Sequence, residues 1–370
     1  MRWKNFAVFS VVFLFVGFVL FGLNSSSAQQ TQPDPSNQKS VPTASPTVSP
    51  TPEQFEDEDD EVIKIDTDVV NVLFTAQDKN RRLLTDLKQA DIRLSEDGQP
   101  QEIVAFSRQV DLPLSLAILI DTSASQERTL PEERAAAKAF LQSVIRPSKD
   151  EVSIISFTGE TTLEQGMTNN LARLNRAIDR VSFVPPSGYI GGGVVAGGTP
   201  PISGSNQMTQ GSTAIWDAIW VTSEEVLKTS PDKTRRAIIL LTDGVNTYGS
   251  KKFDDAVQAA LRSEAIIYSI GVGDEFYGGV DEGVLKRISE RTGGRAFFPR
   301  DEAELRKAFV QIQNEMRSQY LIAYEPTNQK RDGSYRKIQI QLANPELSKQ
   351  KVSLTHRQGY FSQTDKSGGK

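Results

Sequence analysis

An aspartate and two serines follow the first long apolar run of the chain after its N-terminal segment. The stretch LIDTSAS, residues 119–125, places Asp121 directly after apolar residues, with Ser123 and Ser125 at alternate positions behind it. Three kinds of chemistry begin with such an arrangement: an aspartyl protease loop, an aspartate that accepts a phosphoryl group, and a metal site built from oxygen ligands.

Two later stretches carry side chains of the same kind. Asp243 follows the apolar run AIILLT, and Thr213 stands before an expected helix in GSTAIWDAI, with Gly211 in the loop before it. Two carboxylates and three hydroxyls form an oxygen-only set, which selects Mg²⁺, Mn²⁺ or Ca²⁺ over zinc or copper. Because only two of these ligands can be anionic, one coordination position would stay open for a carboxylate offered by a partner.

The two enzymatic alternatives lack residues that they need. An aspartyl protease uses two Asp-Thr-Gly loops that share a proton, but Ser123 replaces the glycine and no second loop exists. A phosphoryl-accepting aspartate needs a second acid beside it, and that place is held by Thr122. Each candidate residue alone is typical of a helix cap or a turn. Asp217, about one turn from Thr213 on the same expected helix, is expected to be structural. The five together favour the metal site, with a secreted aspartyl protease as a remote alternative.

The elements around these residues alternate between apolar strands and amphipathic helices. Strands are predicted at 114–120, 151–157, 163–168, 235–242, 265–273 and 295–299, and helices at 131–145, 171–181, 213–228, 253–264, 280–293 and 301–319. Apolar strands without polar alternation indicate a mostly parallel sheet covered on both faces. The pattern predicts a doubly wound, Rossmann-like α/β domain over 112–317, whose ligands bind where the strands end.

The motif Asp121-x-Ser123-x-Ser125, with Thr213 and Asp243, resembles the metal-ion-dependent adhesion site (MIDAS) of von Willebrand factor type A (VWFA) domains. This resemblance covers residues 112–317. It implies a Mg²⁺ or similar ion held by the serines and threonine, aspartates acting partly through water, and ligand binding rather than catalysis. Ala124 stands where that family often has glycine, and alanine fits if its φ is negative. The flanking segments look like those of exported acidobacterial A-domain proteins, which implies no specific activity.

Two strand-rich segments flank the predicted α/β domain. Residues 62–111 and 318–361 each contain alternating strands with an Asp-Gly turn, at Asp97-Gly98 and at Asp332-Gly333. Because domain termini often lie close together, we hypothesise that these segments join into one sheet and form a second small β domain. Residues 362–370 are expected to form a disordered tail.

The first 61 residues read as targeting and spacer sequence. Basic residues, the apolar run 6–23 and small residues up to Ala28 predict either a cleaved signal peptide or an uncleaved membrane anchor over 1–28. Residues 29–61, rich in proline, serine and threonine and ending in EDEDDE, predict a disordered acidic linker. Export without any cysteine suits a bacterial envelope, so the protein is expected to be periplasmic, secreted or membrane-anchored.

Composition excludes further classes of function. The absence of cysteine removes disulfides and thiolate catalysis, and the chain has a single histidine and no Gly-x-Ser-x-Gly motif for a serine hydrolase. A net charge of -5 makes nucleic acid an unsuitable partner. The sequence therefore favours a non-catalytic, exported protein that binds a protein or matrix ligand through a divalent ion in adhesion or assembly. The alternative is a scaffold subunit of an envelope complex with a structural metal.

A glycine-rich stretch at 185–210 precedes Gly211 and Thr213. It lacks the lysine of a phosphate-binding loop, so its glycines are a weak nucleotide signal. One interpretation is a ligand-contacting loop near the metal, with Tyr189 as its aromatic contact, and the other is a disordered insertion.

Overall fold

The computed structural model describes residues 69–109, 111–185, 189–191, 194–195, 211–231, 233–274 and 278–364. All of these belong to one compact unit, Lys64–Lys370. The predicted signal or anchor, the linker and the last residues of the predicted tail lie outside the described residues, as does most of the glycine-rich stretch. Among the helices that are described, none is both long and apolar enough to cross a membrane.

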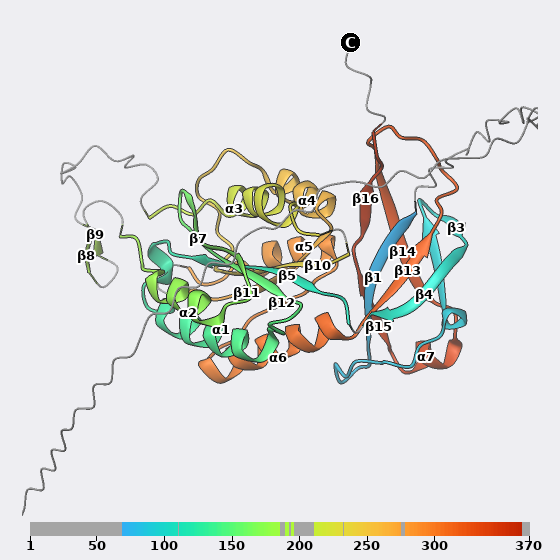
Figure 1. Cartoon of the computed structure of the whole chain (residues 1–370), viewed down its shortest axis with the longest axis horizontal. Coiled ribbons are helices and arrows are strands. Elements are labelled where there is room, and N and C mark those ends of the chain that lie inside the picture. Colours follow the sequence, from blue (N-terminus) through green and yellow to red (C-terminus); the bar gives the residue numbers. More distant parts are fainter. Residues whose placement is uncertain are drawn as a thin grey trace, which may run out of the picture. The chain divides into compact units, whose positions relative to one another are not determined.

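A six-stranded sheet lies at the centre of the α/β domain, in the order β12-β11-β10-β5-β6-β7 (Figure 1). All neighbouring strands are parallel except β7, which pairs antiparallel with β6 at one edge. This arrangement confirms the predicted doubly wound, mostly parallel fold. The strands are β5 (Leu114–Asp121), β6 (Glu151–Phe157), β7 (Thr161–Thr168), β10 (Arg235–Thr242), β11 (Ala265–Gly271) and β12 (Ala296–Phe297).

Helices cover both faces of this sheet (Figure 1). One face carries α1 (Leu130–Val144), α2 (Leu171–Arg180) and α6 (Glu302–Arg317), and the other carries α3 (Ile215–Val221), α4 (Phe253–Arg262) and α5 (Glu282–Thr292). The helix predicted over 213–228 is regular only in its first part, because the π-helical segment η3 (Thr222–Leu227) continues α3.

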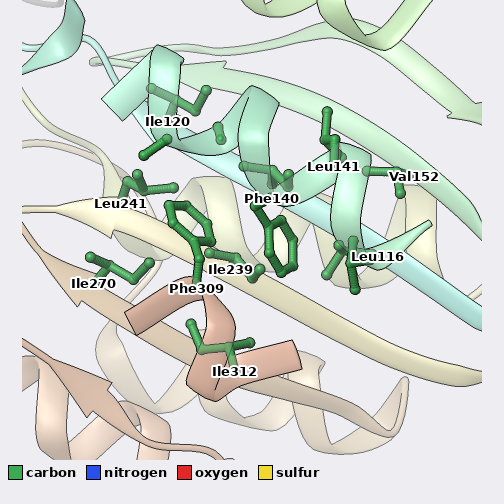
Figure 2. Close-up of a cluster of buried hydrophobic side chains, with 14 of the residues drawn as sticks. Leu116, Ile120, Phe140, Leu141, Val152, Ile239, Leu241, Ile270, Phe309 and Ile312 are labelled. Atoms are coloured by element: carbon green, nitrogen blue, oxygen red, sulfur yellow. The ribbon is translucent and has the colours of Figure 1, made fainter. Parts of the chain in front are cut away.

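The central strands are apolar throughout because each face packs against helices. In β5, Leu116, Ile118 and Ile120 face the cluster that contains α1 and α6, while Ala117 and Leu119 face the opposite cluster. Phe140 of α1 and Phe309 of α6 meet over the sheet with ring centroids 4.8 Å apart (Figure 2). Close packing on both faces makes the sheet rigid, so the ends of its strands are held in fixed positions.

The two flanking segments form a β-sandwich in which their strands alternate. One sheet has the order β15-β1-β13-β4 and the other β16-β14-β2-β3, and all pairs are antiparallel. The N-terminal strands are β1 (Val70–Gln77), β2 (Ile92–Glu96), β3 (Gln99–Gln101) and β4 (Ile103–Gln109). The C-terminal strands are β13 (Gln319–Tyr324), β14 (Tyr335–Leu342), β15 (Ser353–His356) and β16 (Gly359–Phe361). Strands from both segments therefore occur in each sheet, so the segments join as hypothesised, but in two sheets instead of one.

One apolar core lies between the two sheets. It contains Phe74 of β1, Leu94 of β2, Tyr320 of β13 and Ile340 of β14. The predicted turn at Asp97-Gly98 joins β2 to β3, with φ of 47° and 83° at these residues, as a two-residue hairpin requires. Short elements complete this part: η1 (Gln89–Asp91) and α7 (Pro345–Lys349).

Candidate metal centre

Adjacent strands bring the two aspartates to the same edge of the sheet. β5 and β10 are parallel neighbours, with Ile120 opposite Leu241, and each strand ends within two residues of this pair. Asp121 is the last residue of β5, and Asp243 follows the last residue of β10. Because both strands run in the same direction, the two carboxylates emerge side by side at their carboxyl ends.

The loop after Asp121 folds back so that its hydroxyls join the carboxylate. The Ser123 amide donates to Asp121 Oδ1 at 2.9 Å, and the Ser123 and Ser125 hydroxyls are 3.2 Å apart. A 3-10 turn, η2 (Ala124–Gln126), fixes this curvature, and Ala124 is not among the described residues with positive φ. Alanine therefore fits without backbone strain at the position where the family often has glycine.

The Asp243 loop closes on the same group. Asp243 Oδ1 accepts from the Val245 amide at 2.9 Å, and the Ser125 hydroxyl favours the ionised form of the Asp243 carboxylate by lowering its pKa. A Cβ on Gly273, which follows β11, would lie 2.9 Å from the Asp243 Cβ. The absence of a side chain at Gly273 thus lets the strand ends approach this closely.

The backbone of Thr213 is held by two neighbouring loops. Its amide donates to the Thr247 hydroxyl at 2.8 Å, and its carbonyl accepts from the Thr247 amide at 2.9 Å. The next residue, Ala214, donates to the carbonyl of Thr158 at 2.7 Å, just beyond the end of β6. Thr213 is therefore tied both to the loop that follows Asp243 and to the strand beside β5.

The two carboxylates are buried and lack a basic partner. Asp121 is fully buried and Asp243 is 5% exposed, and none of the ion pairs found among the described residues includes either of them. Burial, together with the neighbouring Asp243 carboxylate, raises the pKa of Asp121 to about 7, against the opposing hydrogen bond from the Thr242 hydroxyl. Burial also raises the pKa of Asp243. A cation would offset the cost of ionising this pair.

The donor set fits a hard divalent cation. Asp121, Ser123, Ser125, Thr213 and Asp243 are each at most 9% exposed and offer only oxygen atoms. Within the described part of the chain no group of three or more His, Cys, Asp or Glu side chains could hold a metal, so hydroxyls would have to complete the shell. A site with two carboxylates and three hydroxyls suits Mg²⁺, Mn²⁺ or Ca²⁺.

Three further side chains near this group were not predicted. The Thr242 hydroxyl donates to Asp121 Oδ2 at 2.6 Å. The buried Gln126 amide donates to the Ser125 hydroxyl at 3.3 Å and to the Val272 carbonyl at 3.2 Å. Glu133 is fully buried in the first turn of α1, with no hydrogen-bond partner for either carboxylate oxygen. Its place on the apolar stripe of α1, three residues after Leu130, was the available signal in the sequence.

Asp217 has the structural role that was expected. Its carboxylate accepts from the Ser250 amide at 3.0 Å, from the Ser250 hydroxyl at 2.8 Å and from the Lys251 amide at 3.1 Å. It anchors the loop that follows Asp243 to α3.

Only part of the predicted ligand-contact loop falls within the described residues. Gly211 adopts a left-handed φ of 75°, which glycine accommodates without strain. Tyr189 belongs to the short strand β8 (Tyr189–Gly191), which pairs with β9 (Val194–Val195). The rest of 186–210 lies outside the described residues, so the role of this loop stays a prediction.

Comparisons with known proteins identify the family of the α/β domain. Two family models, both described as von Willebrand factor type A domain, match residues 116–246 and 202–311. This chain is a von Willebrand factor type A domain protein. The narrower resemblance to acidobacterial A-domain proteins stays a prediction. None of the curated proteins matches the chain.

Solved structures that match part of the chain include proximal thread matrix protein 1 from the mussel byssus, at 20% identity and a TM-score of 0.43, covering 60% of this chain and 51% of that one. A second structure of that mussel protein has a zinc-occupied MIDAS motif. An aerotolerance-related membrane protein from Bacteroides fragilis matches at 17% identity and a TM-score of 0.40, over 56% of this chain and all of that one. A von Willebrand factor type A protein from Catenulispora acidiphila matches at 13% identity and a TM-score of 0.43, over 74% and 76%. The chain spans about half the length of the mussel structures.

Proposed function

We propose that this protein binds a protein or matrix ligand through a divalent ion held by Asp121, Ser123, Ser125, Thr213 and Asp243. The observation that carries the proposal is the pair of buried, neighbouring carboxylates, which have hydroxyl groups beside them and no ion pair with a basic side chain among the described residues. Mg²⁺, Mn²⁺ or Ca²⁺ would leave a position for an anionic oxygen, and a ligand carboxylate supplies one. The proposed role is non-catalytic, in adhesion or assembly.

We further propose that the protein acts outside the cytoplasm, secreted, periplasmic or anchored by its N-terminal segment. The support for this location is the apolar run at 6–23 with its basic flank and the absence of cysteine. A carboxylate-bearing partner would then belong to the envelope or the surrounding matrix.

Partner capture tests the proposal. Immobilised wild-type protein and Asp243→Ala are each exposed to envelope and matrix proteins in Mg²⁺ and in EDTA. We expect a partner that the wild type retains only in Mg²⁺ and that Asp243→Ala does not retain. Equal capture under all four conditions would refute a metal-bridged interaction.

A specific observation favours a second role, in which the ion only stabilises the fold. The most exposed of the five side chains, Ser125, is 9% exposed, so the group is accessible to a partner over a small area at most. Thermal unfolding separates the two roles: a scaffold with a structural metal would melt higher in Mg²⁺ while capturing no partner through the ion.

A further inference from the structure

A cavity of about 790 Å³ lies between the β-sandwich and the A domain, far from the carboxyl ends of β5 and β10, where the proposed metal centre lies. Its walls include Arg236 at the start of β10, whereas Asp243 follows the other end of that strand. The remaining walls come from the beginning of β1, the end of α4, the loop between β13 and β14, and β16. A site here is therefore separate from the proposed metal centre.

The charge of the cavity walls is opposite to that of the whole chain. The lining includes seven basic side chains and two acidic ones, although the chain has a net charge of -5. The basic residues are Lys228, Arg236, Arg262, Lys330, Arg331, Arg336 and Arg357, and the acidic ones are Glu264 and Glu325. Concentrating positive charge in a concave, partly desolvated surface favours an anionic ligand.

Two of the arginines are deeply buried and incompletely paired. Arg236 is 8% exposed and Arg336 is 3% exposed, and the Nε of each has no hydrogen-bond partner. Arg236 donates to the Ser230 carbonyl at 2.9 Å, and its nearest carboxylate, that of Glu264, is 3.8 Å away. The Nη1 and Nη2 of Arg336 donate to the carbonyls of Asn328 and Lys330, and its Nη1 is 3.5 Å from Glu96 Oε1, so Nε is the nitrogen without a partner. Leaving a buried guanidinium N–H without an acceptor is costly unless a ligand supplies one.

A third arginine repeats this pattern. Arg357 donates from Nη2 to the Asn71 carbonyl at 2.7 Å, while its buried Nε lacks a partner. Burial lowers the pKa of Arg357, which reflects a charge that water solvates poorly. Anionic oxygens arriving in the cavity would stabilise the charged form of this side chain.

Apolar and aromatic side chains share the walls with these charges. Val69, Leu261, Tyr360 and Phe361 line the cavity, and the Arg262 guanidinium lies 5.7 Å from the centre of the Phe361 ring. The volume exceeds what a single small anion fills. The mixed lining suits a peptide whose side chains carry carboxylates on aliphatic methylene groups. Guanidinium groups pair with carboxylates in planar, bidentate geometry.

We propose that this cavity binds a peptide segment rich in aspartate and glutamate. Exposed Arg262 and Lys330 hold its outer carboxylates, and the buried Arg236 and Arg336 with the half-buried Arg357 hold the inner ones. Binding here requires no divalent ion, so it is independent of the metal-bridged interaction.

Fluorescence anisotropy with a labelled oligoglutamate peptide tests the proposal on the full chain in EDTA. We expect saturable binding, none with oligoglutamine, and about tenfold weaker binding when the NaCl concentration rises from about 50 mM to about 300 mM. Arg262→Glu and Lys330→Glu should each weaken binding about fivefold or more, because each reverses a charge on the rim. Lys307 lies at an exposed position of α6 and outside the cavity, so Lys307→Glu makes the same charge change and should leave binding unaltered.

Three outcomes would overturn the proposal. One is the absence of peptide binding. Another is equal weakening by Lys307→Glu and the two cavity variants, which would show attraction to overall charge. The third is binding of inorganic tripolyphosphate without binding of the peptide, which would assign the cavity to phosphate. Because the assay contains EDTA, loss of the metal site affects none of these readouts.

Discussion

Replacing Glu133 with glutamine should change how stability depends on pH. Glu133 is fully buried in α1, neither of its carboxylate oxygens has a hydrogen-bond partner, and no basic group pairs with it among the described ion pairs. Burial, and to a smaller extent the carboxylates of Asp121 and Asp243, raises its pKa from 4.5 to about 8, against the opposing influence of the Thr129 hydroxyl. Folding therefore favours the protonated form of this side chain.

The sign and the size of the effect follow from that pKa. Between pH 4.5 and about 8 the folded protein keeps a proton on Glu133 that the unfolded chain has lost, so stability falls as pH rises. One such proton changes the free energy of unfolding by about 1.4 kcal/mol per pH unit, which amounts to about 5 kcal/mol across the window. Below pH 4.5 both states are protonated, and the stabilising contribution is fully present.

Urea unfolding at a series of pH values in EDTA measures this dependence. The difference in unfolding free energy between Glu133→Gln and the wild type should move in favour of the variant from pH 5 to 8, because glutamine stays neutral. The exposed neighbour Glu132 provides a matched control, and Glu132→Gln should run parallel to the wild type. A Glu133→Gln curve that also runs parallel to the wild type would refute the inference that this carboxyl is buried without a partner.

Three further predictions concern the surrounding structure. Gly293→Ala should lower the free energy of unfolding in urea by about 1–3 kcal/mol, because Gly293 has a φ of 90° and a Cβ there would lie 2.6 Å from the Arg357 amide nitrogen. Gly278 also has a positive φ, but a Cβ there would meet open space, so Gly278→Ala should cost less. Equal losses of stability in the two variants would contradict the clash. Asp217→Ala should speed hydrogen exchange at the amides of Ser250 and Lys251, because both amides donate hydrogen bonds to the Asp217 carboxylate. Unchanged protection of these amides would contradict the role of Asp217 in holding this loop. A chain ending at Arg317 lacks β13, which lies between β1 and β4. The strand amides of residues 70–109 should therefore lose protection from hydrogen exchange, while those of β5 keep it. Retained protection in β1 would show that the N-terminal strands fold alone.

Much of the α/β domain could be predicted because its strands are buried on both faces. The run 114–120 has no polar alternation, and the structure covers both of its sides with helices. The π-helical turn of η3 was not predicted, since TSEEVL continues the amphipathic spacing of α3 without a distinct local signal. Pairing of the flanking strands was predicted only in outline, because antiparallel partners far apart in sequence are selected by tertiary packing.

The sequence likewise predicted some residues of the candidate site and missed others. Asp121, Ser123, Ser125, Thr213 and Asp243 stood out by residue type and by their position after strands or before a helix. Thr242 and Gln126 did not, because their hydrogen bonds to the site depend on how the strand ends meet. The position of Glu133 on the apolar stripe of α1 was a signal of its burial, but its lack of a hydrogen-bond partner became apparent only once the helix was packed on the sheet.

Isothermal titration of Mg²⁺ into the purified protein tests the central claim most directly. We predict one saturable site in the wild type, loss of that site in Asp243→Ala, and weaker binding in Ser123→Ala. The control variant Asp254→Asn, at an exposed position of α4, should bind as the wild type does. A wild type that binds none of Mg²⁺, Mn²⁺ and Ca²⁺, or an Asp243→Ala variant that binds them equally well, would contradict the assignment of a metal to this edge of the sheet.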